Sequence, residues 1–180
     1  MDIFTPDLAA PKNMLKRLFG KPDPDPAKVS REMRDRAFSM TPTDLRLAPS
    51  SARPHVFCAV METGYEEGVA TLVAVADGSV SLYFSKGGGV IGGGGHESVR
   101  GAAAAFLDAA EVFLPRFEGA NDTPMPSVGQ VRFYLRTFEG IFSVEIQEQT
   151  LGEGRHELSP LFYAAHDVIT RLREETGDDS

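Results

Sequence analysis

The sequence lacks cysteine pairs, tryptophan and long apolar runs. Its one cysteine, Cys58, cannot form an internal disulfide, so a disulfide-stapled extracellular domain is excluded and we expect a cytoplasmic protein. No apolar run approaches the ~20 residues that a membrane-spanning helix needs, so no membrane partner is expected. The first residues also lack the basic and then apolar pattern of a secretory signal.

Positive charge is scarce as well. The chain has 18 Lys and Arg against 26 Asp and Glu, which gives a formal net charge of −8. A negative field repels phosphate backbones, so a nucleic-acid partner is not expected. The same charge would suit a basic partner, which keeps an acidic inhibitor of the immunity type as one alternative, although solubility alone also explains it.

The chain divides into four expected parts. Residues 1–26 form an extended N-terminal tail, because the prolines that alternate through 22–26 disfavour helix. Residues 27–54 contain an amphipathic helix, which ends near Thr41, and a connection. Residues 55–175 form a single domain, and residues 176–180 are a short acidic tail.

One segment of the tail has the pattern of a short amphipathic helix. Its apolar residues would share one helical face, opposite a basic pair; they are Met14, Leu15, Leu18 and Phe19, with Lys16 and Arg17 opposite. A segment this short is not helical by itself, so we expect it to dock on its own domain or on a partner rather than on a membrane.

The fold class expected for 55–175 is α+β, with a five-stranded antiparallel sheet in the order β-β-β-α-β-β-α. Strands are predicted at 55–62 and 69–76, and a third follows a tight Asp77-Gly78 turn that would pair Val75 with Val80. A second hairpin covers 130–137 and 141–148, and helices cover 97–117 and about 159–174.

The segment Lys86–Glu97 has seven glycines within nine residues, between a predicted strand and a predicted helix. Such a segment could hold a small anionic ligand, because backbone N–H groups and a helix N-terminus would converge there. The residues that would form this site are Lys86, Gly92, Gly93, Gly94, Gly95 and His96. The alternatives are tight turns with close helix–sheet packing, and a flap used by a partner.

Catalytic chemistry has a single weak candidate. His96 at the start of the predicted helix could act as a general base on a small phosphorylated or carboxylated substrate, which is the enzyme alternative. Cys58 lies mid-strand among apolar residues, where thiols are usually inert. Glu62, Glu66 and Glu67 lie around Tyr65 after the first predicted strand; we expect an acidic surface turn there, and the alternative is that two of them face a site. No motif indicates a cofactor or a metal site.

The second hairpin gives a candidate interface. Strand alternation puts Arg132, Tyr134, Arg136 and Glu145 together on the face away from the predicted core. These residues could form an ordinary solvated face, or a surface that binds a protein partner, with a homodimer as the simplest form. The function expected from the sequence is therefore a binding or scaffold module, and its ligand is not identified.

Overall fold

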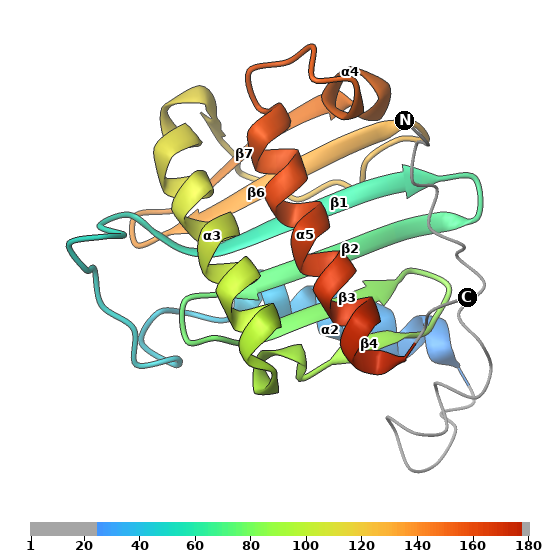
Figure 1. Cartoon of the computed structure of the whole chain (residues 1–180), viewed down its shortest axis with the longest axis horizontal. Coiled ribbons are helices and arrows are strands. Elements are labelled where there is room, and N and C mark those ends of the chain that lie inside the picture. The colour runs from blue at the N-terminus through green and yellow to red at the C-terminus, as the bar shows by residue number, and fades with distance from the viewer. Residues whose placement is uncertain (1–24, 178–180) are drawn as a thin grey trace.

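The computed structural model describes residues 25–177, and the segments 1–24 and 178–180 lie outside that range. The fold is α+β with an antiparallel sheet, as expected. Seven strands form the sheet: β1 (Val56–Tyr65), β2 (Gly68–Val75), β3 (Val80–Phe84), β4 (Gly89–Ile91), β5 (Glu118–Gly119), β6 (Gln130–Thr137) and β7 (Ile141–Gln147). Their spatial order is β4-β3-β2-β1-β6-β7-β5 (Figure 1).

The expectation of five strands was wrong because it missed the two edge strands. β4 lies inside the glycine-rich segment and pairs with β3, and β5 follows the second predicted helix and pairs with β7. Both strands are only two or three residues long. Strands this short are fixed by backbone pairing and show no alternation of apolar and polar residues that a sequence could reveal.

The helices match the predicted segments to within a few residues. They are α2 (Pro26–Ser39), α3 (Glu97–Phe113) and α5 (Ser159–Thr176), to which the structure adds a short α4 (Glu148–Gly152). α3 stops before Pro115, and Leu114–Arg116 continues as one turn of 3₁₀ helix. No helix within residues 25–177 is both long enough and apolar enough to cross a bilayer.

The first hairpin has a register that differs from the expected one. Ala74, and not Val75, is opposite Val80. The connection is longer by one residue because Asp77 Oδ1 accepts a hydrogen bond from the Ser79 N–H, and Gly78 takes a positive φ of 92°. A one-residue shift exchanges the faces of a strand. Ser81 is therefore opposite Val73, and both lie on the face that α2 covers.

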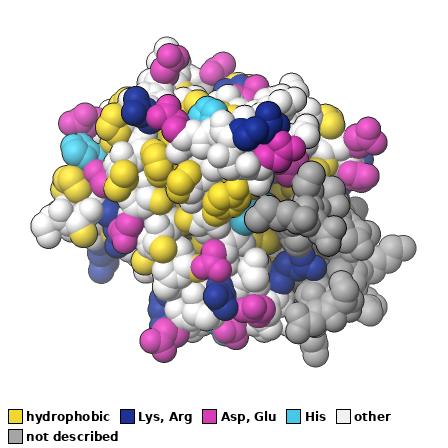
Figure 2. Space-filling view, turned by 45° about the horizontal axis from the view of Figure 1, so that its top comes forward, with side chains coloured by type: hydrophobic (Ala, Val, Ile, Leu, Met, Phe, Trp, Pro, Cys, Tyr) yellow, Lys and Arg dark blue, Asp and Glu magenta, His cyan; other side chains and the backbone are white. Residues whose placement is uncertain are grey.

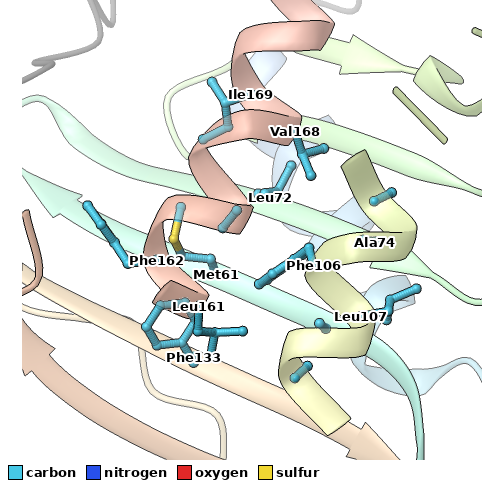
Figure 3. Close-up of a cluster of buried hydrophobic side chains, with 14 of the residues drawn as sticks. Met61, Leu72, Ala74, Phe106, Leu107, Phe133, Leu161, Phe162, Val168 and Ile169 are labelled. Atoms are coloured by element: carbon cyan, nitrogen blue, oxygen red, sulfur yellow. The ribbon is translucent and has the colours of Figure 1, made fainter. Parts of the chain in front are cut away.

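The main core lies between the sheet and the pair α3 and α5, which cross one face of the sheet side by side (Figure 1). Side chains from the sheet, such as Met61, Leu72 and Phe133, meet Phe106 of α3 and Leu161 of α5 in this layer (Figure 3). Each of these five side chains is at most 2% exposed. Burying one such side chain contributes about 1.5–3 kcal/mol, so this layer holds the fold together.

The opposite face of the sheet is covered mainly by α2, which lies behind the sheet in Figure 1. Ala37 of α2 packs into a second, smaller cluster with Phe57, Val73 and Tyr134. A proline at its first turn and the side chain of Asp25, which accepts the Lys28 N–H, fix where α2 begins. The two faces therefore differ, with two long helices on one and a single helix on the other.

Candidate functional site

A groove of about 640 Å³ lies between α2 and the β3–β4 side of the sheet. One wall is the face of α2 that carries Val29 and Met33, one turn apart, and it continues to Met40, the residue after the helix. The floor consists of sheet residues, with Val73, Val75 and Ser81 among them. The opposite wall is formed by the hairpin turn and the glycine-rich segment; it contains Asp77, Gly78, Ser79, Ile91, Gly92, Gly94 and Gly95.

No side chains project from several positions of the wall that the glycine-rich segment forms. A Cβ atom added at Gly92 or Gly95 would meet nothing within 4 Å, so no side chain fills the space beside them. Ile91 on the edge strand β4 is 39% exposed, although it is a large apolar residue. The groove is therefore an apolar surface that the described part of the chain leaves open.

The charges of the groove lie on opposite walls. Arg36 belongs to the α2 wall and Asp77 to the hairpin wall, and both side chains are exposed. The hydroxyl of Ser81 adds a polar group on the floor. An occupant could thus bury an apolar side against the floor and meet one charge of each sign at the rim.

A buried ion pair fixes α2 to the sheet next to the groove. The Arg34 guanidinium donates two hydrogen bonds to the Glu62 carboxylate, from Nε to Oε1 at 2.6 Å and from Nη2 to Oε2 at 2.8 Å. Nη2 also donates to the Thr123 carbonyl at 2.7 Å, and the Thr71 hydroxyl donates to Glu62 Oε1 at 3.0 Å. The Glu62 side chain is 0% exposed, so this pair is a specific clamp between the helix and the sheet.

Sequence reasoning missed Glu62, because β1 continues to Tyr65 and the expected acidic surface turn does not begin until after it. A signal was present in the alternation, since Cys58, Val60 and Glu62 fall on one face of a strand that was otherwise predicted to be buried. A carboxylate on such a face needs a buried partner. That partner comes from α2, which a pattern within the strand could not indicate.

Two tyrosines complete the buried polar layer. The Tyr134 hydroxyl donates to the Pro124 carbonyl, and burial, together with the nearby Glu62 carboxylate, raises the pKa of Tyr134 to about 12. The Tyr83 hydroxyl is buried and has no hydrogen-bond partner among the described residues. Burial, and then the negative charge of Glu62, raises the pKa of Tyr83 above its ordinary value. Both phenols are therefore neutral near pH 7 and are not bases.

The four residues predicted as an interface are close together but differ in exposure. Arg132 Nη2 and Glu145 Oε2 form an ion pair at 2.9 Å at the edge of this face. Tyr134 is 0% exposed, and Arg136 is 8% exposed and donates to the Ala37 carbonyl of α2 at 2.8 Å. Since α2 and the 120–128 loop reach over this face, only Arg132 and Glu145 remain for surface contact. The predicted homodimer stays a prediction.

The glycine-rich segment has an ordered backbone whose N–H groups are partly used. The N–H of Gly95 donates to the Gly92 carbonyl and that of His96 to the Gly93 carbonyl, each at 3.1 Å. A Cβ at Gly93 would lie 2.2 Å from the Leu172 side chain, and one at Gly94 only 1.9 Å from the Gly78 carbonyl oxygen. Close packing, as in the alternative of tight turns with close helix–sheet packing, therefore accounts for two of its glycines: Gly93 packs against Leu172 of α5 and Gly94 against the hairpin turn.

The residues of the predicted anion site do not converge. Lys86 lies before β4 and His96 after it, so they are at opposite ends of this edge strand. Nδ1 of His96 lies 3.0 Å from the Glu175 carboxylate, and Ser98 donates to the same group at 2.6 Å. A carboxylate at this position repels an anion, and it already contacts Nδ1 of the histidine. The anion site and the role of His96 as a base stay predictions with little support from this geometry.

Other reactive groups also lie apart. Burial raises the pKa of the Cys58 thiol to about 12, so it is not a nucleophile at neutral pH. Residues 25–177 contain no group of three or more His, Cys, Asp or Glu side chains that could hold a metal ion.

On the α3 and α5 face, side chains of both charge signs are scattered among small apolar groups, without one large acidic patch (Figure 2).

The chain was compared with family models, curated proteins and solved structures. No family model matches it, and no curated protein or solved structure is similar to it. The function must therefore be inferred from the groove and its surroundings.

Proposed function

We propose that this protein is a non-catalytic binding module that takes a short amphipathic segment of another protein into the groove between α2 and the β3–β4 side of the sheet. The observation that carries the proposal is the groove itself, an open apolar channel of about 640 Å³. Monomeric proteins rarely leave such surfaces open unless they bind something there.

The shape of the groove favours a chain segment as its occupant. Val29 and Met33 of α2 and Met40 just after it line the groove, and the eleven residue steps from Val29 to Met40 correspond to a length of roughly 16 Å. A channel that runs along a helix suits a rod-shaped occupant, and helix-in-groove recognition uses apolar anchors one helical turn apart. Two of the lining residues are methionines, whose flexible side chains adapt to different partners.

The polar groups favour an occupant with one polar side. Arg36 and Asp77 lie at the rim, on opposite walls, where they can pair with charges on the exposed side of a bound helix. The floor offers mainly apolar surface, so the buried side must be apolar. This combination describes an amphipathic helix better than a fully apolar lipid or a small anion.

The proposal can be tested by selecting random 12-residue peptides on the immobilised full chain. We expect the selected peptides to carry apolar residues at helical spacing, and to lose at least tenfold in affinity for Ser81→Trp. Ser81 lines the floor and is half-buried, so a tryptophan there would fill the channel.

Ser143→Trp is the matched control. Ser143 is also half-buried, and it lies in the same cross-strand row as Ser81, which runs through Val73, Val60 and Tyr134. It does not line the groove. Equal loss of affinity in both variants, or none in either, would contradict the proposal. Binding of the apolar dye 8-anilinonaphthalene-1-sulfonate in the groove, with no peptide selected, would show that the site takes small molecules instead.

A further inference from the structure

We propose that the groove has an internal occupant, the segment Met14–Phe19 of the same chain, which competes with partner segments. This inference rests on the proposed function of the groove and adds its regulation. The described residues leave the groove open, and they begin at Asp25, only four residues before the groove-lining Val29. Twenty-four residues precede that point, and they include a segment with the required pattern.

The chemistry of this segment matches the groove. Its apolar residues would share one helical face, and the pair Lys16 and Arg17 would lie opposite them. With the apolar face on the floor, the basic pair would point out toward the rim, where Asp77 belongs to the hairpin wall. The segment is too short to be helical alone, so the groove would also supply the contacts that make it fold.

The linker has the right length. Residues 20–25 connect Phe19 to the start of α2, and prolines at 22 and 24 favour an extended backbone. Six extended residues span about 19 Å at roughly 3.1 Å each. The far end of the groove, at Met40, lies fifteen residues beyond Asp25, which is about 22 Å along the helix axis. The linker can therefore carry Phe19 back over most of the groove, although not to its far end.

A tethered segment competes strongly even when its own affinity is low. A short linker holds it at an effective concentration of about 1 mM. If its intrinsic dissociation constant is about 100 μM, the apparent affinity of a competing segment falls about tenfold. The groove would then bind only partners with clearly higher affinity, or open when a partner captures the N-terminal segment.

The test uses full-length variants and a fluorescent peptide with the sequence of residues 10–21. In Leu15→Ser/Leu18→Ser the internal segment loses its apolar face, and we expect this variant to bind the peptide about tenfold more tightly than the unmodified chain. The matched control Ile3→Ser/Leu8→Ser makes the same kind of change in the N-terminal residues outside Met14–Phe19 and should differ from the unmodified chain by less than threefold. Adding Ser81→Trp to the first variant should abolish the gain.

The outcomes separate this inference from the proposed function. Equal peptide affinity in the unmodified chain and the Leu15→Ser/Leu18→Ser variant would overturn the internal occupant, while selected peptides that Ser81→Trp excludes would still support the groove. Failure of every peptide in every variant would overturn both. Light scattering should give the same oligomeric state for the unmodified chain and for Leu15→Ser/Leu18→Ser. A dimer that this variant dissociates would mean that the segment docks on a second copy, which overturns the intramolecular form.

Discussion

Replacing Arg34 by methionine tests the most specific contact between α2 and the sheet. Methionine keeps an apolar stem but leaves the Glu62 carboxylate, which is 0% exposed, with the Thr71 hydroxyl as its one remaining partner among the hydrogen bonds described. Removing one partner of a buried ion pair costs about 3–5 kcal/mol. For a chain of this size that corresponds to a fall in Tm of roughly 6–20 °C.

Urea unfolding at neutral pH measures this cost, and the same helix supplies a control. Arg31 pairs with Asp25 at 3.2 Å, but the two side chains are 58% and 51% exposed. Arg31→Met should therefore cost less than about 1 kcal/mol. The double variant Arg34→Met/Glu62→Met removes both charges and should be more stable than Arg34→Met alone. A cost below about 1 kcal/mol for Arg34→Met, or a double variant that is no more stable than Arg34→Met, would refute a buried clamp.

Three further predictions follow from packing and burial. Gly94→Ala should destabilise the fold by about 1–3 kcal/mol, because its Cβ would meet the Gly78 carbonyl oxygen. Gly95→Ala, whose Cβ would point into open space, should change stability by less than about 0.5 kcal/mol. Equal effects of the two variants in thermal unfolding would contradict the close contact between Gly94 and Gly78. The buried thiol of Cys58 should react with Ellman's reagent at about pH 8 only as fast as the protein unfolds, and rapid reaction of the native protein would argue against its burial. Burial lowers the pKa of His166 from 6.5 to about 4, so the unfolded chain binds this proton at a higher pH than the folded chain does. As the pH falls from 6.5 to 4, the free energy of unfolding of the wild type should therefore fall by about 1–3 kcal/mol more than that of His166→Gln. Parallel curves of stability against pH would show that the ring is not desolvated.

The sequence predicts the parts of the fold that depend on local pattern. The five long strands and three long helices lie where alternation and helical spacing indicate, and the turn near Gly140 is in place, since Thr137 donates its N–H to the Gly140 carbonyl. The edge strands β4 and β5 could not be predicted, because their pairing is made by the backbone alone. The register of the first hairpin also failed, since one Asp77 side-chain hydrogen bond sets the loop length.

The candidate site depends on contacts between segments that are distant in the sequence. Arg34 and Glu62 are 28 residues apart, and nothing in the sequence around either residue predicts that the two form a pair. The sequence did identify the glycine-rich segment as unusual, and Gly94 lies where only a residue without a side chain fits against Gly78. What it could not indicate is the groove, which exists only because α2 lies across part of one sheet face. The groove thus follows from tertiary packing, and no motif encodes it.

The location of the groove follows from how the second sheet face is covered. On the β6 side, the loop 120–128 reaches over the face and accepts hydrogen bonds from Arg34 and Tyr134 through its carbonyl groups. In the middle, α2 is fixed by the ion pair to Glu62. No such cover reaches the β3–β4 side within the described residues, where the floor stays apolar and Ile91 stays exposed. Val29, Met33 and Ile91 on the walls keep part of their apolar area exposed. Since burying that area would gain free energy, the uncovered β3–β4 side is where an additional segment is expected to bind.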